Sequence, residues 1–295
     1  MTQKRGIKMQ LTERKLMICN DVEKPQNILK LSFTKELKTL EDIFPEKISK
    51  AAKAEVLNVE ECKQLISPQG HRKEWKRVYA DCSGLQTLTG FQEGLEELYA
   101  GACPHLHYPV DLPASCRIAD FDGSGIRALR KPMLDHQNRR KTLVYQPMTE
   151  GLDVLSLRYC TQLSSLNGIP QSLKTLDVTQ TNITDFEGIG PNVTYINASD
   201  CWHLKSLKGL PASCKRLNLD WSGIESLEGL PENIEEVRVY FCNALKNDAF
   251  AKIPPHLLPK IKGLQFYQQE IVNSLYQSWI QQRVLIKTLN GFERQ

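Results

Sequence analysis

The cysteines of this chain recur at a fixed interval, and this interval constrains the fold more than any other feature. Five of them are separated in turn by 41, 57, 41 and 41 residues: Cys62, Cys103, Cys160, Cys201 and Cys242. The longest interval equals the others plus 16 residues, which indicates an insertion within residues 131–148. A repeat of this length predicts a solenoid, because single units cannot bury their own apolar faces and are stable only when stacked.

Each period of 41 residues holds one unit of 20 residues and one of 21. Counted from the opening residue of a unit as zero, apolar residues fall at +3, +6 and +8, as in Cys214, Leu217 and Leu219 after Pro211. The longer unit carries Cys at +11, whereas the shorter one carries Ser or Thr there, at Ser83, Ser124, Thr181 and Ser222. The units open near Pro25, Pro45, Arg72, Gln92, Pro113, Thr149, Pro170, Gly190, Pro211 and Pro231.

This pattern predicts a leucine-rich-repeat solenoid in which about ten short strands form a parallel, concave β-sheet. A unit of 20 residues leaves no room for a full helix, so we expect extended or irregular returns on the convex side. The second unit holds about six extra residues, and its strand is expected over Glu55–Val59.

A stacked array needs a cap at each end. We predict an N-terminal cap or leader over residues 1–24, the repeat array over 25–251 and a C-terminal cap over 252–295. Within the C-terminal cap we expect a final strand at Leu264–Phe266 and a helix at Gln268–Leu289. The apolar residues expected near one face of that helix are Ile271, Leu275, Trp279 and Ile286.

The composition is that of an ordinary globular protein and lacks the marks of several function classes. The 38 basic and 34 acidic residues give a net charge of +4, which is too small to argue for nucleic-acid binding. No apolar run is long enough for a membrane span or a signal-peptide core. Phosphate-binding loops, zinc-protease motifs and nucleophile elbows are also absent, so we expect no catalytic residue, no cofactor and no metal.

The nine cysteines raise the question of thiol chemistry. Strands lie about 4.8 Å apart, so cysteines in alternate coils should be roughly 9–10 Å apart, beyond the ~7 Å limit for a disulfide. We therefore expect the cysteine ladder to be small buried side chains in a reducing compartment. Only Cys82, which falls at +10, and Cys19 are expected to be accessible. A thiol enzyme that uses Cys82 stays an alternative.

The concave face carries the candidate binding residues. Side chains at +5, +7, +9 and +10 should point to it, since neighbours in a strand alternate faces. These positions are rich in Tyr, Trp and Arg among acids, the composition of protein-interface hot spots, and their mixed charge does not resemble a nucleic-acid surface. The predicted partner-binding residues are Arg77, Tyr79, Asp81, Tyr99, Arg158, Tyr159, Tyr195, Asp200, Arg216, Asp220, Trp221, Arg238, Tyr240 and Phe241.

Further predictions concern the charges on this face. Asp120, Asp122 and Asp177 also fall at concave positions. Towards the C-terminal half, we expect Arg216 and Arg238 to pair with carboxylates of a partner. Asp200 and Asp220 would receive its basic groups.

A recurrent phrase links the chain to a known family. GLPASC (209–214), GLPENI (229–234) and GIPQSL (168–173) resemble the short-repeat leucine-rich proteins that intracellular bacterial pathogens inject into host cells, over about residues 25–250. Two features depart from that family. Cys alternates with Ser or Thr where those effectors usually carry Asn, and only 44 residues follow the repeats, whereas the ubiquitin-ligase members append a large catalytic domain.

The resemblance implies a secreted virulence effector that passes from the bacterial cytoplasm to the host cytosol. Together with the concave face, it predicts a non-enzymatic module that binds a folded host protein or another bacterial enzyme and modulates it, for instance by occluding its active site. A housekeeping cytosolic scaffold of the same fold is the alternative.

Overall fold

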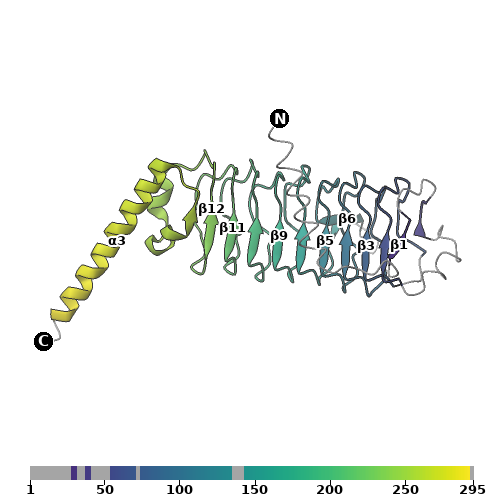
Figure 1. Ribbon diagram of the computed structural model, residues 1–295, viewed down its shortest axis with the longest axis horizontal. Coiled ribbons are helices and arrows are strands. Elements are labelled where there is room, and N and C mark those ends of the chain that lie inside the picture. The colour runs from purple at the N-terminus through teal and green to yellow at the C-terminus, as the bar shows by residue number, and fades with distance from the viewer. Residues whose placement is uncertain (1–27, 32–36, 41–53, 71–73, 135–142, 293–295) are drawn as a thin grey trace.

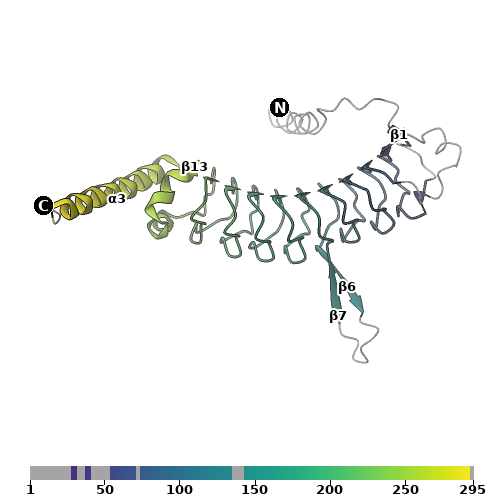
Figure 2. The same ribbon diagram turned by 90° about the horizontal axis from the view of Figure 1, so that it is seen from below.

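The computed structural model describes residues 28–31, 37–40, 54–70, 74–134 and 143–292. The predicted leader at 1–24 and Cys19 lie outside these residues. Within them, the chain winds into a gently curved solenoid with one long parallel sheet along its inner side (Figures 1 and 2).

The sheet has eleven strands, and each pairs in parallel with the next one along the solenoid. They are β1 (Ile28–Lys30), β2 (Val56–Asn58), β3 (Arg77–Tyr79), β4 (Glu97–Tyr99), β5 (Ile118–Asp120), β8 (Val154–Ser156), β9 (Thr175–Asp177), β10 (Tyr195–Asn197), β11 (Arg216–Asn218), β12 (Glu236–Arg238) and β13 (Ile261–Lys262). Ten repeat units and a final strand account for all eleven. The chain has the predicted leucine-rich-repeat fold.

In the strands of the sheet from β2 to β12, the central residue, at +6, forms the core. These residues are aligned across the sheet and are at most 2% exposed: Leu57, Val78, Leu98, Ala119, Leu155, Leu176, Ile196, Leu217 and Val237. Complete burial of a Leu or Val side chain contributes about 1.5–3 kcal/mol. The flanking residues at +5 and +7 therefore stand on the opposite, concave face of the sheet.

The convex returns between β3 and β12 contain turns and no helix in the part of the chain that the structure describes, as a 20-residue period predicts. One return differs from the rest. Here β6 (Arg130–Leu134) and β7 (Leu143–Pro147) form an antiparallel hairpin that projects from the convex side (Figure 2). It occupies the position predicted for the 16-residue insertion.

The cysteine ladder is structural, as expected from its spacing. Cys62, Cys103, Cys160, Cys201 and Cys242 are at most 4% exposed, and each thiol donates a hydrogen bond to a backbone carbonyl one coil earlier. Burial raises the pKa of the Cys160 thiol to about 12. No two of the eight cysteines in the described residues form a disulfide, and Cys82 is the only one of them that is not buried.

Both ends of the array depart from the predicted register. In β1, Leu29 pairs with Leu57, the central residue of β2. The count used in the other units would place Leu31 there, so β1 begins two residues earlier than predicted. The final strand β13 is at Ile261–Lys262, three residues before the predicted Leu264–Phe266. The reason is a pair of compact 3-10 helices, η3 (Asn247–Lys252) and η4 (Pro255–Lys260), which return the chain to the sheet early.

The helix α3 (Phe266–Phe292) leads away from the end of the solenoid (Figures 1 and 2). The predicted helix at Gln268–Leu289 lies inside it, but its packing face differs by about one residue from the expected one. Val272 and Gln268 are buried against the last coil, whereas Ile271 is only partly covered. Gln268 belongs to this face because its side-chain amide donates to the Leu245 carbonyl.

Candidate protein-binding surface

The residue at +10 of each coil lies in the turn three residues after the strand ends, and these residues form a row from coil to coil, here called the turn row. In nine successive coils its backbone has a positive φ between 50° and 69°, at Glu61, Cys82, Ala102, Gly123, Tyr159, Gln180, Asp200, Trp221 and Phe241. This left-handed conformation costs about 1–2 kcal/mol for a residue with a Cβ. A repeated bond between coils offsets part of that cost, as where the Trp221 N–H donates to the Tyr240 carbonyl at 2.7 Å.

Three exposed aromatic residues of the last two full coils, two of them members of this row, lie together at its C-terminal end. Trp221 and Phe241 stack with ring centroids 4.3 Å apart and an angle of 22° between the rings. Tyr240 precedes Phe241, and the exposed fractions of Trp221, Tyr240 and Phe241 are 43%, 44% and 53%. We call these three residues the aromatic patch. It is an open apolar surface at the C-terminal part of the concave side.

The charged neighbours of the patch are already engaged within the molecule. The guanidinium of Arg238 lies 5.3 Å from the centre of the Tyr240 ring and binds the Asp220 carboxylate at 2.7 Å. The same carboxylate accepts the Tyr240 backbone N–H at 2.9 Å. Arg238 and Asp220, which we expected to pair with charges of a partner, are therefore paired with each other in the chain alone. Their ion pair holds Tyr240 in place instead.

Asp200 and Arg216 differ from that pair. The carboxylate of Asp200 has no ion pair or side-chain hydrogen bond within the described residues. Burial, and then the nearby charge of Asp220, raise its pKa above the ordinary value for an aspartate. Arg216 lies over the Tyr195 ring at 5.3 Å, so β10 and β11 each contribute one member of this cation–π pair.

The candidate residues of the first coils mostly bind one another. Arg77 donates two hydrogen bonds to the Glu97 carboxylate, at 2.7 and 3.0 Å, and the Tyr99 hydroxyl donates to the same carboxylate at 2.9 Å. Tyr79 and Tyr99 stack at 5.0 Å, and Tyr99 is buried. Burial and the bond to Glu97 raise the pKa of Tyr99. The Asp81 carboxylate accepts the Gly101 N–H at 2.8 Å.

The middle of the concave face holds a second aromatic–arginine pair. The Arg158 guanidinium lies 5.2 Å from the Tyr159 ring centre and donates to the Tyr159 hydroxyl at 3.1 Å. Arg158 is mostly buried, and its Nε atom lies 4.0 Å from the Asp177 carboxylate. Tyr159 is 41% exposed and lies in the turn row. In the turn row, Gln180 and Asp200 lie between Tyr159 and Trp221, so Tyr159 is separate from the aromatic patch.

Two ladders of acidic and amide side chains were missed at the sequence level. At +7, a side-chain oxygen accepts the backbone N–H two residues later, at Asn58, Asp120, Asp177, Asn197 and Asn218. At +9, a carboxylate accepts the N–H at the same position of the next coil, at Asp81, Asp122 and Asp220. The recurrence of Asp and Asn at these positions was the available signal. These side chains satisfy turn backbone rather than await a partner.

Cys82, the candidate of the thiol-enzyme alternative, lies in surroundings that do not activate a thiol. Cys82 is partly exposed, but burial and the nearby Glu61 carboxylate raise its pKa. A nucleophilic thiol needs the opposite shift, since the thiolate is the reactive form. Among the described residues, no group of three His, Cys, Asp or Glu side chains could hold a metal ion. No helix in that part of the chain is both long and apolar enough to cross a membrane.

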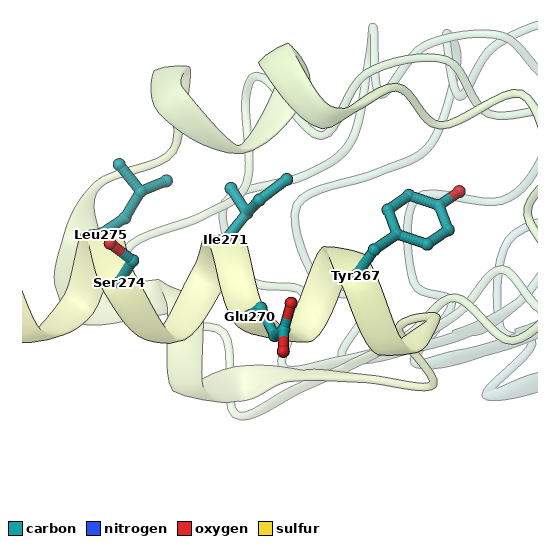
Figure 3. Close-up of a pocket in the computed structure, with 5 residues that line it drawn as sticks. All are labelled: Tyr267, Glu270, Ile271, Ser274 and Leu275. Atoms are coloured by element: carbon teal, nitrogen blue, oxygen red, sulfur yellow. The ribbon is translucent and has the colours of Figure 1, made fainter.

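A shallow hollow lies along one side of α3 (Figure 3). Its volume is about 470 Å³, and it is lined by Tyr267, Glu270, Ile271, Ser274 and Leu275. Ile271 and Leu275 point to the same side of the helix in this view. All five lining residues come from α3 alone, so the hollow is a shallow surface feature beside the last coil.

Comparisons with known proteins give distant similarities. No family model matches the chain. Over 117 residues, 40% of the chain and 8% of the relative, it is 29% identical to disease resistance protein RRS1 of Arabidopsis thaliana. Among solved structures, YopM from Yersinia enterocolitica WA-314 aligns with a TM-score of 0.43 and 20% identity, over 72% of this chain and 46% of that one. The chain thus spans less than half the length of each of these proteins.

Proposed function

We propose that this chain is a non-enzymatic module that binds a folded protein through the C-terminal part of its concave face. The observation that carries the proposal is the exposed stack of Trp221 on Phe241 at two strained backbone positions. An exposed aromatic cluster marks an interaction site more often than a tolerated surface. The few residues that dominate the binding energy of protein interfaces are also enriched in Trp, Tyr and Arg.

The backbone strain at Trp221 and Phe241 also supports a binding site at these residues. The turn row has Gly123 at one position, and a glycine there carries no left-handed penalty. Trp221 and Phe241 accept that penalty and also expose large apolar rings to water. Strained residues persist where the surrounding structure holds them and cluster at functional sites. Binding of a partner would bury both rings and recover the cost of their exposure.

The internal bonds of the concave face favour a rigid binding surface. The Arg238–Asp220 pair fixes Tyr240, and the two ladders fix the turns between neighbouring coils. A surface fixed in this way loses little conformational entropy when a partner binds. We infer that the solenoid covers a folded partner, and that occlusion of an enzyme's active site is one effect such a surface can have.

The biological setting that we propose rests on the repeat type. The GLPASC and GLPENI phrases, which precede β11 and β12, resemble the short repeats of effectors that intracellular bacterial pathogens inject into host cells. We therefore propose a secreted effector that acts in the host cytosol on a host protein or on another bacterial enzyme. The buried thiols agree with a reducing compartment.

The test compares two tyrosines that differ mainly in their place on the molecule. Tyr240 lies on the concave side and Tyr145 on the convex hairpin; they are 44% and 46% exposed, and an arginine lies over each ring. The full chain and its Tyr240→Ala and Tyr145→Ala variants would be used to capture proteins from infected-cell lysate and from bacterial lysate. Candidates retained by the wild type would then be titrated against all three.

We expect Tyr240→Ala to weaken binding at least tenfold, about 1.4 kcal/mol, and Tyr145→Ala to leave it unchanged. The lysate that supplies the partner decides between a host target and a bacterial one. A partner that binds both variants as well as the wild type, or that is lost only with Tyr145→Ala, would contradict a concave binding site.

A further inference from the structure

The turn row places a carboxylate next to the aromatic patch. Asp200, Trp221 and Phe241 hold the same +10 position in three adjacent coils, and the Asp200 N–H donates to the Asp220 carbonyl at 2.8 Å. The strands of β10 and β11 are paired in register, so corresponding residues of these coils lie about 4.8 Å apart. Asp200 therefore flanks the Trp221–Phe241 stack on its N-terminal side.

Asp200 carries a negative charge that no cation of the described residues compensates. Asp220 has Arg238 as its ion-pair partner, whereas the Asp200 carboxylate has no such partner within the described residues. Asp200 is partly buried, and the neighbouring Asp220 charge adds to the cost of its ionised form. A cation brought by a partner would relieve both effects.

The rings of Trp221 and Phe241 indicate which kind of cation a partner would bring to Asp200. The faces of Trp and Phe rings attract a positive charge, and a planar guanidinium stacks on them while it donates hydrogen bonds to a carboxylate. The concave face already places an arginine over an aromatic ring three times within the molecule, and at Arg238 the same guanidinium also binds a carboxylate, that of Asp220. Arg158, Arg216 and Arg238 each lie over a tyrosine ring at 5.2–5.3 Å. At Asp200 and the Trp221–Phe241 stack the acid and the rings are present, but no arginine of the described residues lies over either ring.

We propose that Asp200 and the Trp221–Phe241 stack form a subsite that receives an arginine side chain of the protein partner. The guanidinium would stack on the exposed ring face and donate to the Asp200 carboxylate. This inference rests on the proposed function, since it specifies the chemistry that the partner presents at the same surface.

The test uses a small probe and so does not depend on knowing the partner. The chain contains four tryptophans, and after incorporation of 5-fluorotryptophan each gives a ¹⁹F resonance that can be assigned through single Trp→Phe substitutions. N-acetyl-arginine amide would be titrated into the full chain. N-acetyl-citrulline amide, which has nearly the same shape but no charge, is the matched probe, and N-acetyl-lysine amide compares a non-planar cation.

We expect the arginine probe to shift the Trp221 resonance saturably, with half-saturation on the order of millimolar for so small a ligand. The resonance of Trp202, which is 56% exposed outside the turn row, should not respond. Citrulline amide should bind about tenfold more weakly, and lysine amide should fall between the two. Asp200→Asn should reduce the affinity for arginine to that for citrulline, and Asn tolerates the left-handed backbone at this position.

Equal binding of the arginine and citrulline probes, full retention of arginine binding by Asp200→Asn, or a response of Trp202 in place of Trp221 would overturn the subsite. These failures differ from failure of the proposed function. If Tyr240→Ala abolishes partner binding while the arginine probe does not bind, the concave interface stands and the arginine subsite is wrong.

Discussion

Position 221 gives an unusual prediction, because glycine there should be more stable than alanine. The φ of Trp221 is 61°, in the left-handed region. Alanine keeps the left-handed penalty of about 1–2 kcal/mol, whereas glycine avoids it. Glycine loses more entropy on folding, which costs about 0.5–1 kcal/mol relative to alanine. The difference leaves Trp221→Gly more stable than Trp221→Ala by about 0.5–1 kcal/mol.

The wild type should have a free energy of unfolding close to that of Trp221→Gly. Both substitutions remove the stack on Phe241, and such aromatic pairs contribute about 0.5–1.5 kcal/mol. Relief of strain in Trp221→Gly offsets that loss, so its free energy of unfolding should stay within about 1 kcal/mol of the wild type. Partner binding should nevertheless fall at least tenfold in both variants, since both lack the ring.

The assay is urea unfolding of the full chain, with the midpoints of the three proteins compared at a common m-value. Trp202 provides the control, because it is exposed but does not have a positive φ. At Trp202, alanine should be at least as stable as glycine. If Trp221→Ala were the more stable variant at 221, the left-handed turn row would be wrong. If Trp221→Gly kept full partner binding, the ring would not be a contact.

Three further predictions concern the thiols and the support of Tyr240. Among the described cysteines, Cys82 should react first with a bulky maleimide, and faster labelling of Cys160 would contradict the register. Because the pKa of Cys82 is raised, its labelling rate should be slow at neutral pH and should increase as the pH rises. Cys160→Ser should be more stable than Cys160→Leu in thermal unfolding, because a hydroxyl can keep the hydrogen bond to the Phe121 carbonyl whereas Leu overfills the turn. The reverse order of stability would contradict this packing. Gly263→Ala should weaken partner binding as well as stability, since a Cβ at position 263 would clash with the Tyr240 ring. An unchanged affinity would show that partner binding does not depend on this position of the ring.

The repeat period made most of the fold predictable. The aliphatic residue at +6 and the Cys, Ser or Thr at +11 recur in every full coil, so one alignment of the units predicts both the core and the sheet register. The ends were harder, because β1 and β13 lie where the period breaks. The residues 247–260 form two 3-10 helices, and their length along the chain does not follow from the repeat.

The candidate site was predictable in its residues but not in their roles. The sequence places Trp221, Tyr240 and Phe241 in adjacent coils, and the register of β11 and β12 brings them together. It does not distinguish Asp200 from Asp220, since both appear as acids on one face. The distances separate them, because Asp220 binds Arg238 at 2.7 Å while Asp200 has no such bond to any residue that the structure describes. The positive φ of the turn row was also hidden, because residues as different as Glu61 and Phe241 adopt it.

The most direct measurement of the concave interface is a tyrosine-modification footprint of the complex with a captured partner. Tyr240 and Tyr145 have nearly equal exposure in the chain alone, so their modification rates by the same reagent can be compared with and without the partner. The concave interface predicts that the partner protects Tyr240 at least several-fold and leaves Tyr145 unchanged. Protection of Tyr145 with no change at Tyr240 would place the partner on the convex hairpin and contradict the proposed function.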